Sequence, residues 1–131
     1  MRMSGPVLDA PDVAELTRFY QRFLGWEIEK LQGPRPGHPS GDGWSRLRPV
    51  DGSTKIEIQF EENYERPVWP ARSGQPGMQV HLDIWVAEVS AGVAWAIECG
   101  AVEASTQPEG RDLARLRVML DPAGHPFCLW S

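Results

Sequence analysis

Two side chains suited to acid–base chemistry, His81 and Asp83, stand two positions apart in an alternating segment of the chain. In a β-strand, residues i and i+2 point to the same face, so the imidazole and the carboxylate are expected to lie side by side. A carboxylate that orients an imidazole prepares it for general acid–base catalysis. The same pair also occurs as a hydrogen-bonded structural contact, and the sequence leaves both interpretations open.

Strand alternation adds aromatic and polar residues to this pair. If the apolar members of each alternating segment pack under a helix, the residues between them point to the opposite face. Guanidinium groups bind carboxylates or phosphates and indole rings stack on flat ligands, which predicts a concave site for a polar or anionic aromatic molecule. The ligand-binding candidates are Trp44, Glu57, Gln59, His81, Trp85, Arg115, Arg117, Cys128 and Trp130.

Other arginines and histidines fit this site less well. Arg46 and Arg48 are expected to point into water at a sheet edge, and His38 lies in a loop rich in proline and glycine. His125 belongs to a Gly-His-Pro turn. Within residues 113–120, the alternation places Leu116, Val118 and Leu120 under the helix, and Arg115, Arg117 and Met119 on the open face.

The elements that position these residues occur twice. An apolar stripe at helical spacing runs over residues 13–24, after Asp12 as cap and before Gly25, and strands are predicted at 26–31, 44–50 and 55–61. The order begins again with a strand at 81–86, and at an offset of about 76 Asp12 falls on Glu88 and Phe19 on Trp95.

This repeat predicts an α+β protein made of tandem βαβββ modules. We expect residues 1–131 to form a single domain, with module 1 at 5–62, a connector at 63–79 and module 2 at 80–131.

Composition narrows the function classes. The net charge of −5 over 131 residues argues against nucleic acid or an anionic membrane as the main partner. No apolar run approaches the roughly 20 residues that span a bilayer, and no secretory signal is evident. With two cysteines and no CxxC motif, the chain is expected to be cytoplasmic.

Three segments are similar to motifs of one superfamily. They are FYQRFLGWE at 19–27, HLDIWV at 81–86 and DPAGHPFCL at 121–129. Together with the repeat, they resemble the vicinal-oxygen-chelate superfamily, which includes glyoxalase I, extradiol dioxygenases, fosfomycin-resistance enzymes and bleomycin-binding proteins. The resemblance implies a glyoxalase-like fold, a small-molecule site in the cleft between the modules, and a homodimer.

In metal-dependent members of this superfamily, four side chains from the first and last strands of the two modules hold one ion. The matching positions here are Gly5, Glu57 (or Gln59), His81 and Cys128. This ligand set is incomplete, so neither metal nor cofactor is expected. If a metal does bind, the resemblance assigns it to His81 and Glu57, and a His/Cys/Glu set is one that zinc accepts.

Three functions are compatible with these residues. The first is a bleomycin-resistance-like module that binds a small molecule without chemistry. The second is a metal-dependent lyase, isomerase or dioxygenase in which Glu57 or His81 transfers a proton. The third is a metal-free enzyme that uses His81 and Asp83.

Overall fold

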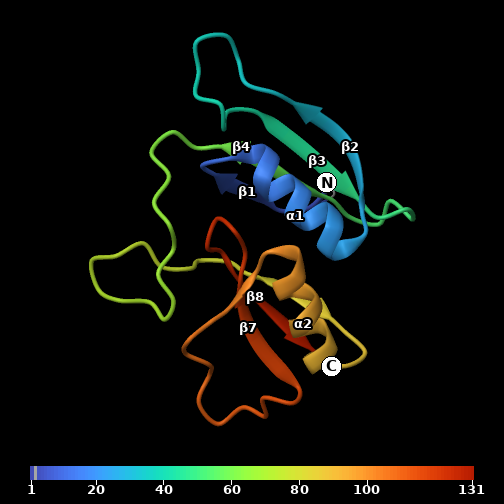
Figure 1. The fold of residues 1–131 in the computed structure, drawn as a ribbon, viewed down its shortest axis with the longest axis vertical. Coiled ribbons are helices and arrows are strands. Elements are labelled where there is room, and N and C mark those ends of the chain that lie inside the picture. Colours follow the sequence, from blue (N-terminus) through green and yellow to red (C-terminus); the bar gives the residue numbers. More distant parts are fainter. Residues whose placement is uncertain (2) are drawn as a thin grey trace. The chain divides into compact units, whose positions relative to one another are not determined.

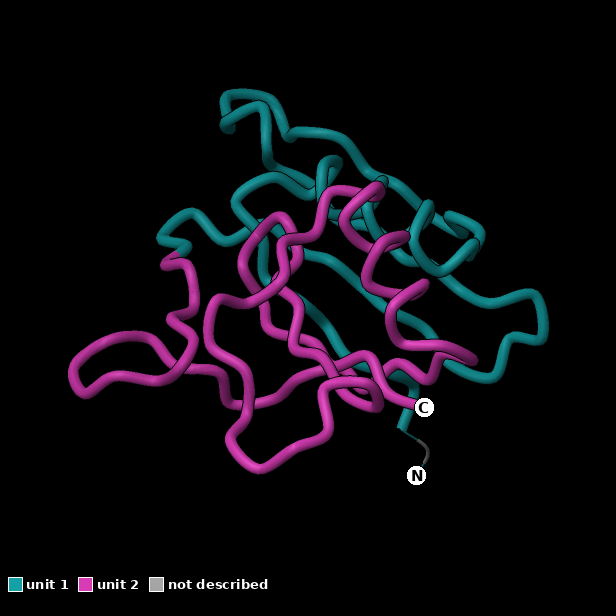
Figure 2. The backbone as a smooth tube through the Cα atoms, turned by 60° about the horizontal axis from the view of Figure 1, so that its bottom comes forward, with its two compact units in different colours: residues 1–64 teal, residues 65–131 magenta. Residues whose placement is uncertain are grey.

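The computed structural model describes residues 1 and 3–131 and divides into two compact units (Figures 1 and 2). The first unit is Met1–Tyr64 and the second is Glu65–Ser131. Each contains one helix and one four-stranded sheet. This is the α+β construction that the sequence repeat predicts.

The first unit has the order βαβββ. Its elements are β1 (Val7–Ala10), α1 (Val13–Leu24), β2 (Glu27–Gln32), β3 (Trp44–Arg48) and β4 (Ile56–Phe60). Across the sheet the strands follow the order β1-β4-β3-β2, with β1 parallel to β4 and the other neighbours antiparallel.

The second unit repeats this construction. Its elements are β5 (Leu82–Trp85), α2 (Val89–Cys99), β6 (Val102–Glu103), β7 (Leu116–Leu120) and β8 (Pro126–Trp130). The sheet order is β5-β8-β7-β6, again with the first strand parallel to the last and the other neighbours antiparallel.

The two helices begin and end in the same way. Asp12 caps α1 by accepting a hydrogen bond from the Glu15 amide at 2.8 Å, and Glu88 caps α2 through the amides of Ser90 and Ala91. Gly25 and Gly100 end the helices at φ 66° and 115°, where a residue with a Cβ is strained. The two caps lie 76 residues apart, the predicted offset.

Each unit has its own hydrophobic core between helix and sheet. In the first unit Leu16 and Tyr20 of α1 are fully buried, as are Leu47 and Ile58 of the sheet. In the second unit, buried members of α2 and of β7 and β8 form the core: Val89, Val93, Ala96, Val118, Met119, Phe127 and Leu129. In each unit, the core therefore lies between the helix and one face of the sheet.

Most of the predicted connector belongs to the second unit. Its Arg66 Nη1 donates to the Pro122 carbonyl at 2.9 Å, and Trp69 Nε1 donates to the Thr106 carbonyl at 2.8 Å. These contacts hold the segment against the second unit, where it adds side chains to the site described below.

The alternation of β7 is shifted by one residue from the predicted one. Arg117 pairs with Leu129 and Met119 with Phe127 across the β7–β8 ladder. Directly paired residues share a face, and Phe127 and Leu129 are fully buried on the α2 side of the sheet. The prediction that Arg117 and Met119 lie on the open face is therefore wrong.

The alternation of β7 is ambiguous because Met119 is apolar, so both faces of the strand carry an apolar side chain. Met119 is fully buried, because its flexible side chain fills the core. The charged end of Arg117 stays partly exposed, and its Nη1 donates to Glu103 Oε1 at 2.7 Å. Leu116 and Val118 accordingly line the open face.

Candidate functional site

The open face of the second sheet holds the largest group of predicted site residues. Asp83 pairs with Cys128 and Trp85 with Trp130 in the parallel β5–β8 register, so all four point away from α2, as the strand parity predicted. Trp85 and Trp130 remain 63% and 43% exposed. Both indole rings are thus accessible to solvent, whereas the Cys128 side chain is less exposed.

A pocket of about 230 Å³ opens on this face. Most of its lining is apolar, and the connector contributes part of one wall. The lining residues are Trp69, Met78, His81, Pro108, Arg111, Leu116, Val118, Pro126 and Cys128. An apolar body of modest size suits such a lining.

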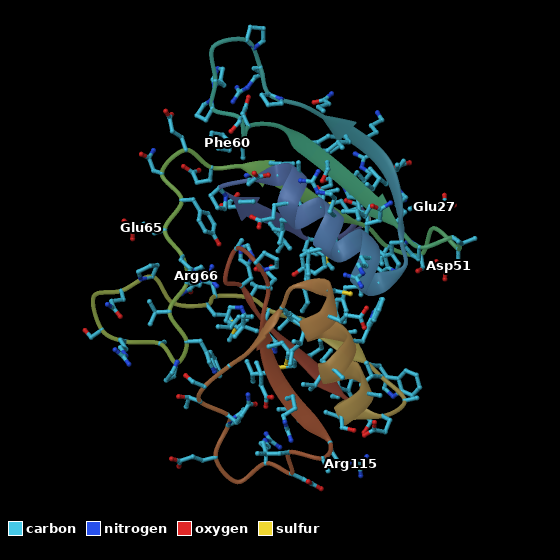
Figure 3. The ribbon with its side chains drawn as sticks, in the orientation of Figure 1. Glu27, Asp51, Phe60, Glu65, Arg66 and Arg115 are labelled. Atoms are coloured by element: carbon cyan, nitrogen blue, oxygen red, sulfur yellow. The ribbon has the colours of Figure 1, made fainter. Side chains whose placement is uncertain are left out.

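A shallower pocket of about 500 Å³ lies beside the first and shares Arg111 and Leu116 with it. Its lining also includes Asp83, Asp112, Arg115 and Trp130. Figure 3 labels Arg115, which directly precedes β7. Because both pockets share an arginine, one cation is within reach of a ligand in either.

Arg111 is a site residue that strand alternation did not predict. Among the residues that the structure describes, none forms a hydrogen bond or ion pair with its guanidinium. Arg111 lies in the loop between β6 and β7, where no alternating pattern assigns it a face. The feature of the sequence that could have indicated this residue is its position directly after the Glu109-Gly110 turn, where a basic side chain follows a loop.

The arginines that the sequence did single out already have partners. Arg115 donates to the Ser131 carbonyl at 3.0 Å, and Arg117 donates to Glu103 and to the Leu113 carbonyl. An anion would have to compete with these contacts. Arg111 is therefore the better anion-binding cation of this unit.

His81 and Asp83 form the predicted pair. His81 Nε2 lies 3.1 Å from Asp83 Oδ1, and the two side chains are 38% and 64% exposed. If Nε2 carries the ring proton in this contact, Nδ1 is left as the basic atom. The arrangement allows proton transfer at Nδ1, and the catalytic role stays a prediction.

Cys128 differs from a reactive thiol. Burial raises the pKa of the Cys128 thiol to about 11, and the negative charge of Asp83 beside it adds to the rise. The thiol is therefore protonated at neutral pH, which makes it a weak nucleophile.

In the first unit, Glu57 belongs to an ion-pair cluster on the open face of its sheet. Glu57 Oε2 lies 2.6 Å from Lys55 Nζ, and Oε1 lies 2.7 Å from Arg46 Nη2. The Lys55 hydrogen bond, together with that of Arg46, lowers the pKa of Glu57 from its ordinary value. Glu57 is an ionised, engaged carboxylate rather than a free base.

The two arginines expected to point into water are paired instead. Arg46 contacts both Glu57 and Glu29, and Arg48 Nε donates to Glu29 at 2.9 Å. The Arg46 guanidinium also lies 5.1 Å from the centre of the Trp44 ring. Both arginines are therefore engaged with carboxylates of neighbouring strands.

Trp44 and Gln59 line a separate polar pocket of about 370 Å³ in the first unit. The Gln59 side chain donates to Asp9 Oδ1 at 2.8 Å. In the lining of the same pocket, Arg35 binds Asp42 through two hydrogen bonds of 2.8 Å, which hold the pKa of Asp42 far below its usual range. This pocket carries no net charge from its own lining.

The four-ligand metal set that the superfamily resemblance implies does not fit these residues. A Cβ on Gly5 would lie 2.1 Å from the Lys55 carbonyl oxygen, so no ligand can be carried there. Glu57 is already held by two cations, and the Cys128 thiol is protonated. His81 alone among the four is well suited to bind an ion there.

The remaining histidines follow their predicted structural roles. His125 Nδ1 contacts Asp121 Oδ2 at 2.8 Å inside the turn that precedes β8. His38 lies in the exposed loop between β2 and β3. Neither lines any of the pockets described above.

The likeness to known proteins extends over almost the whole chain. A family model described as a glyoxalase-like domain matches residues 6–130. No curated protein matches the sequence. In the described part of the chain, neither helix is long and apolar enough to cross a membrane.

Solved structures share the fold at low identity. A glyoxalase family protein from Enterococcus faecalis aligns with a TM-score of 0.67 and 22% identity over 99% of this chain and 97% of its own. The fosfomycin resistance protein FosX from Listeria monocytogenes, solved with Mn(II) and a dihydroxypropylphosphonic acid, gives 0.69 and 16% over 98% and 90%. A glyoxalase/bleomycin resistance protein/dioxygenase family enzyme from Burkholderia phytofirmans gives 0.63 and 21% over 96% and 94%.

Proposed function

This chain belongs to the glyoxalase-like domain family, and from that premise we propose that its second unit binds a small molecule with a flat apolar body and one anionic group. The apolar body occupies the pocket of about 230 Å³, between the connector and the open face of the sheet. The anion binds Arg111. The protein acts as a binding module and carries out no reaction on this ligand.

The observation that carries the proposal is an unpaired cation at the junction of two pockets. Arg111 has no partner among the described residues, whereas Arg115 beside it is engaged with the Ser131 carbonyl. A guanidinium without a protein partner presents a planar fork of donors to a carboxylate. The apolar lining contributed by Trp69, Met78 and Leu116 supports a ring next to that anion.

Binding of this ligand is proposed to proceed without the superfamily's four-ligand metal. The support is the ligand set itself, with Gly5 unable to carry a side chain and Glu57 held by Lys55 and Arg46. The anion is neutralised by a side chain of the protein instead. We therefore expect ligand affinity to be the same with and without EDTA.

The test compares a charged probe with its neutral analogue. Isothermal titration calorimetry in EDTA measures 2-naphthoate and 2-naphthamide, which differ in the charge of one group. Wild type should bind the carboxylate more tightly, and Arg111→Gln should remove this preference. Loss of one charge-assisted contact costs about 1.5–3 kcal/mol, or roughly 10- to 150-fold in Kd.

Arg72→Gln is the matched control, because Arg72 is exposed in the connector and lines neither pocket of the second unit. It should leave both affinities unchanged. Equal affinity of wild type for the two probes, or equal loss of naphthoate binding in both variants, would contradict the proposal.

A second candidate function is metal-free proton transfer by His81, favoured by its 3.1 Å contact with Asp83. It predicts that the protein exchanges an acidic C–H of a bound arylacetate with solvent. Proton NMR in D₂O measures this exchange, which His81→Gln should abolish. If the arylacetate binds and its C–H does not exchange with solvent, this second function is excluded and the protein acts as the binding module proposed above.

A further inference from the structure

The shallow pocket of about 500 Å³ in the second unit carries charges of both signs in its lining. Arg111 and Arg115 contribute two positive charges, and Asp83 and Asp112 contribute two negative charges. An anion at Arg111 uses only one sign of this lining. A ligand with a carboxylate as its only charge would meet two carboxylates of the protein, and the repulsion between like charges lowers affinity.

Asp112 has room for a further hydrogen-bond donor. Its Oδ1 accepts a hydrogen bond from the Ala114 amide at 2.9 Å, which orients the carboxylate in the loop before β7. Within the described part of the chain, no cation pairs with this carboxylate, although Arg111 is its neighbour in the sequence. The carboxylate is therefore held in place by the protein while its charge is left for a ligand.

Asp83 and Trp130 add to the part of this pocket that suits a cation. They lie on the neighbouring strands β5 and β8 and share the open face of the sheet. A carboxylate binds an ammonium group through charge-assisted hydrogen bonds, and the face of an indole ring also attracts a cation. Asp83 already contacts His81 at 3.1 Å, so Asp112 is the carboxylate with more capacity for an added donor.

We propose that the ligand of the second unit is an aromatic amino acid with a free α-amino group, an inference that rests on the binding function proposed above. The aromatic ring occupies the apolar pocket of about 230 Å³, and the carboxylate binds Arg111, which lines both pockets. The ammonium group binds Asp112, with Asp83 and Trp130 beside it in the shallow pocket.

The charge pattern of the lining favours a ligand that carries both charges close together. In an α-amino acid, one carbon atom bears the carboxylate and the ammonium group, and Arg111 and Asp112 are consecutive residues of one loop. A purely cationic ligand would leave Arg111 without a partner, and a purely anionic one would leave Asp112 without a partner. Unpaired charges in a site disfavour a ligand, so both kinds should bind more weakly than the amino acid.

The experiment compares 3-(2-naphthyl)alanine with 3-(2-naphthyl)propionate, which lacks only the amino group, by isothermal titration calorimetry in EDTA. Wild type should bind the amino acid about five- to tenfold more tightly. Asp112→Asn should remove most of this preference without weakening propionate binding, and its amide oxygen can still accept from the Ala114 amide. Glu109→Gln is the matched control, because Glu109 is exposed on the same loop and lines neither pocket, and it should keep the preference.

A second measurement needs no variant and so avoids any folding defect. N-acetylation of 3-(2-naphthyl)alanine removes the positive charge, and wild type should then bind this probe no more tightly than the propionate. Equal affinity of wild type for the amino acid and the propionate, or a preference that survives in Asp112→Asn, would overturn the inference. Equal binding of these two probes refutes only the amino-acid class, whereas failure of both to bind refutes the binding function itself.

Discussion

Replacing Gly5 by alanine tests why the first unit offers no metal ligand at this position. Gly5 has φ 141°, and an added Cβ would lie 2.1 Å from the Lys55 carbonyl oxygen and 2.9 Å from Lys55 Cγ. The backbone cannot yield without moving the segment before β1 away from β4. Unfavourable φ costs about 1–3 kcal/mol and overpacking about 1–3 kcal/mol, so we expect a loss of about 3 kcal/mol.

The assay is urea unfolding followed by circular dichroism, with thermal unfolding beside it. A loss of this size lowers Tm by about 10 °C in a chain of this length. Gly33→Ala is the control, because its added Cβ meets nothing within 4 Å and should change stability by less than about 0.5 kcal/mol. If the free energy of unfolding of Gly5→Ala lies within about 1 kcal/mol of the wild-type value, the steric reason for the absence of a ligand at Gly5 is wrong.

Three further predictions concern charged residues. Lys55→Met should lower the free energy of unfolding by about 2 kcal/mol in urea titrations, because Glu57 loses the nearer of its two cations, and unchanged stability would contradict the ion-pair cluster. The Arg35 hydrogen bonds lower the pKa of Asp42, so its carboxylate stabilises the native state above about pH 4 and this contribution is lost as the pH falls. Asp42→Asn should therefore flatten the decline of stability between about pH 5 and about pH 2, and a slope equal to wild type would refute this. Arg117→Met should leave naphthoate affinity unchanged, because Arg117 lies on the α2 side of the sheet, and a Kd weaker by about tenfold would place it in the site.

The sequence predicted the duplicated fold because several independent signals agree. Helical stripes, caps at Asp12 and Glu88, and glycines at Gly25 and Gly100 recur in the same order in both halves. Such local signals act within a few residues, and no tertiary contact is needed to interpret them. The open-face positions of His81 and Cys128 followed from the same alternation, which the β5–β8 register confirms for Cys128.

The sequence alone did not predict side-chain positions and partners that depend on tertiary contacts. In β7 both faces carry apolar side chains, so alternation could not show that Met119 enters the core. The partners of Arg46 lie on β2 and β4, and no local pattern pairs them. Arg111 lies in a loop, where the side-chain direction depends on the whole path of the chain. Hydrophobic periodicity therefore does not predict binding sites that are built from loop residues.

The position of a bound probe on the second unit tests the proposed binding site most directly. Intermolecular NOEs between 2-naphthoate and isotope-labelled protein locate its ring. We predict contacts from the ring to Trp69, Met78 and Leu116, together with a shift of the Arg111 side-chain resonances. NOEs to residues of the first unit alone, with Arg111 unperturbed, would contradict the proposed site.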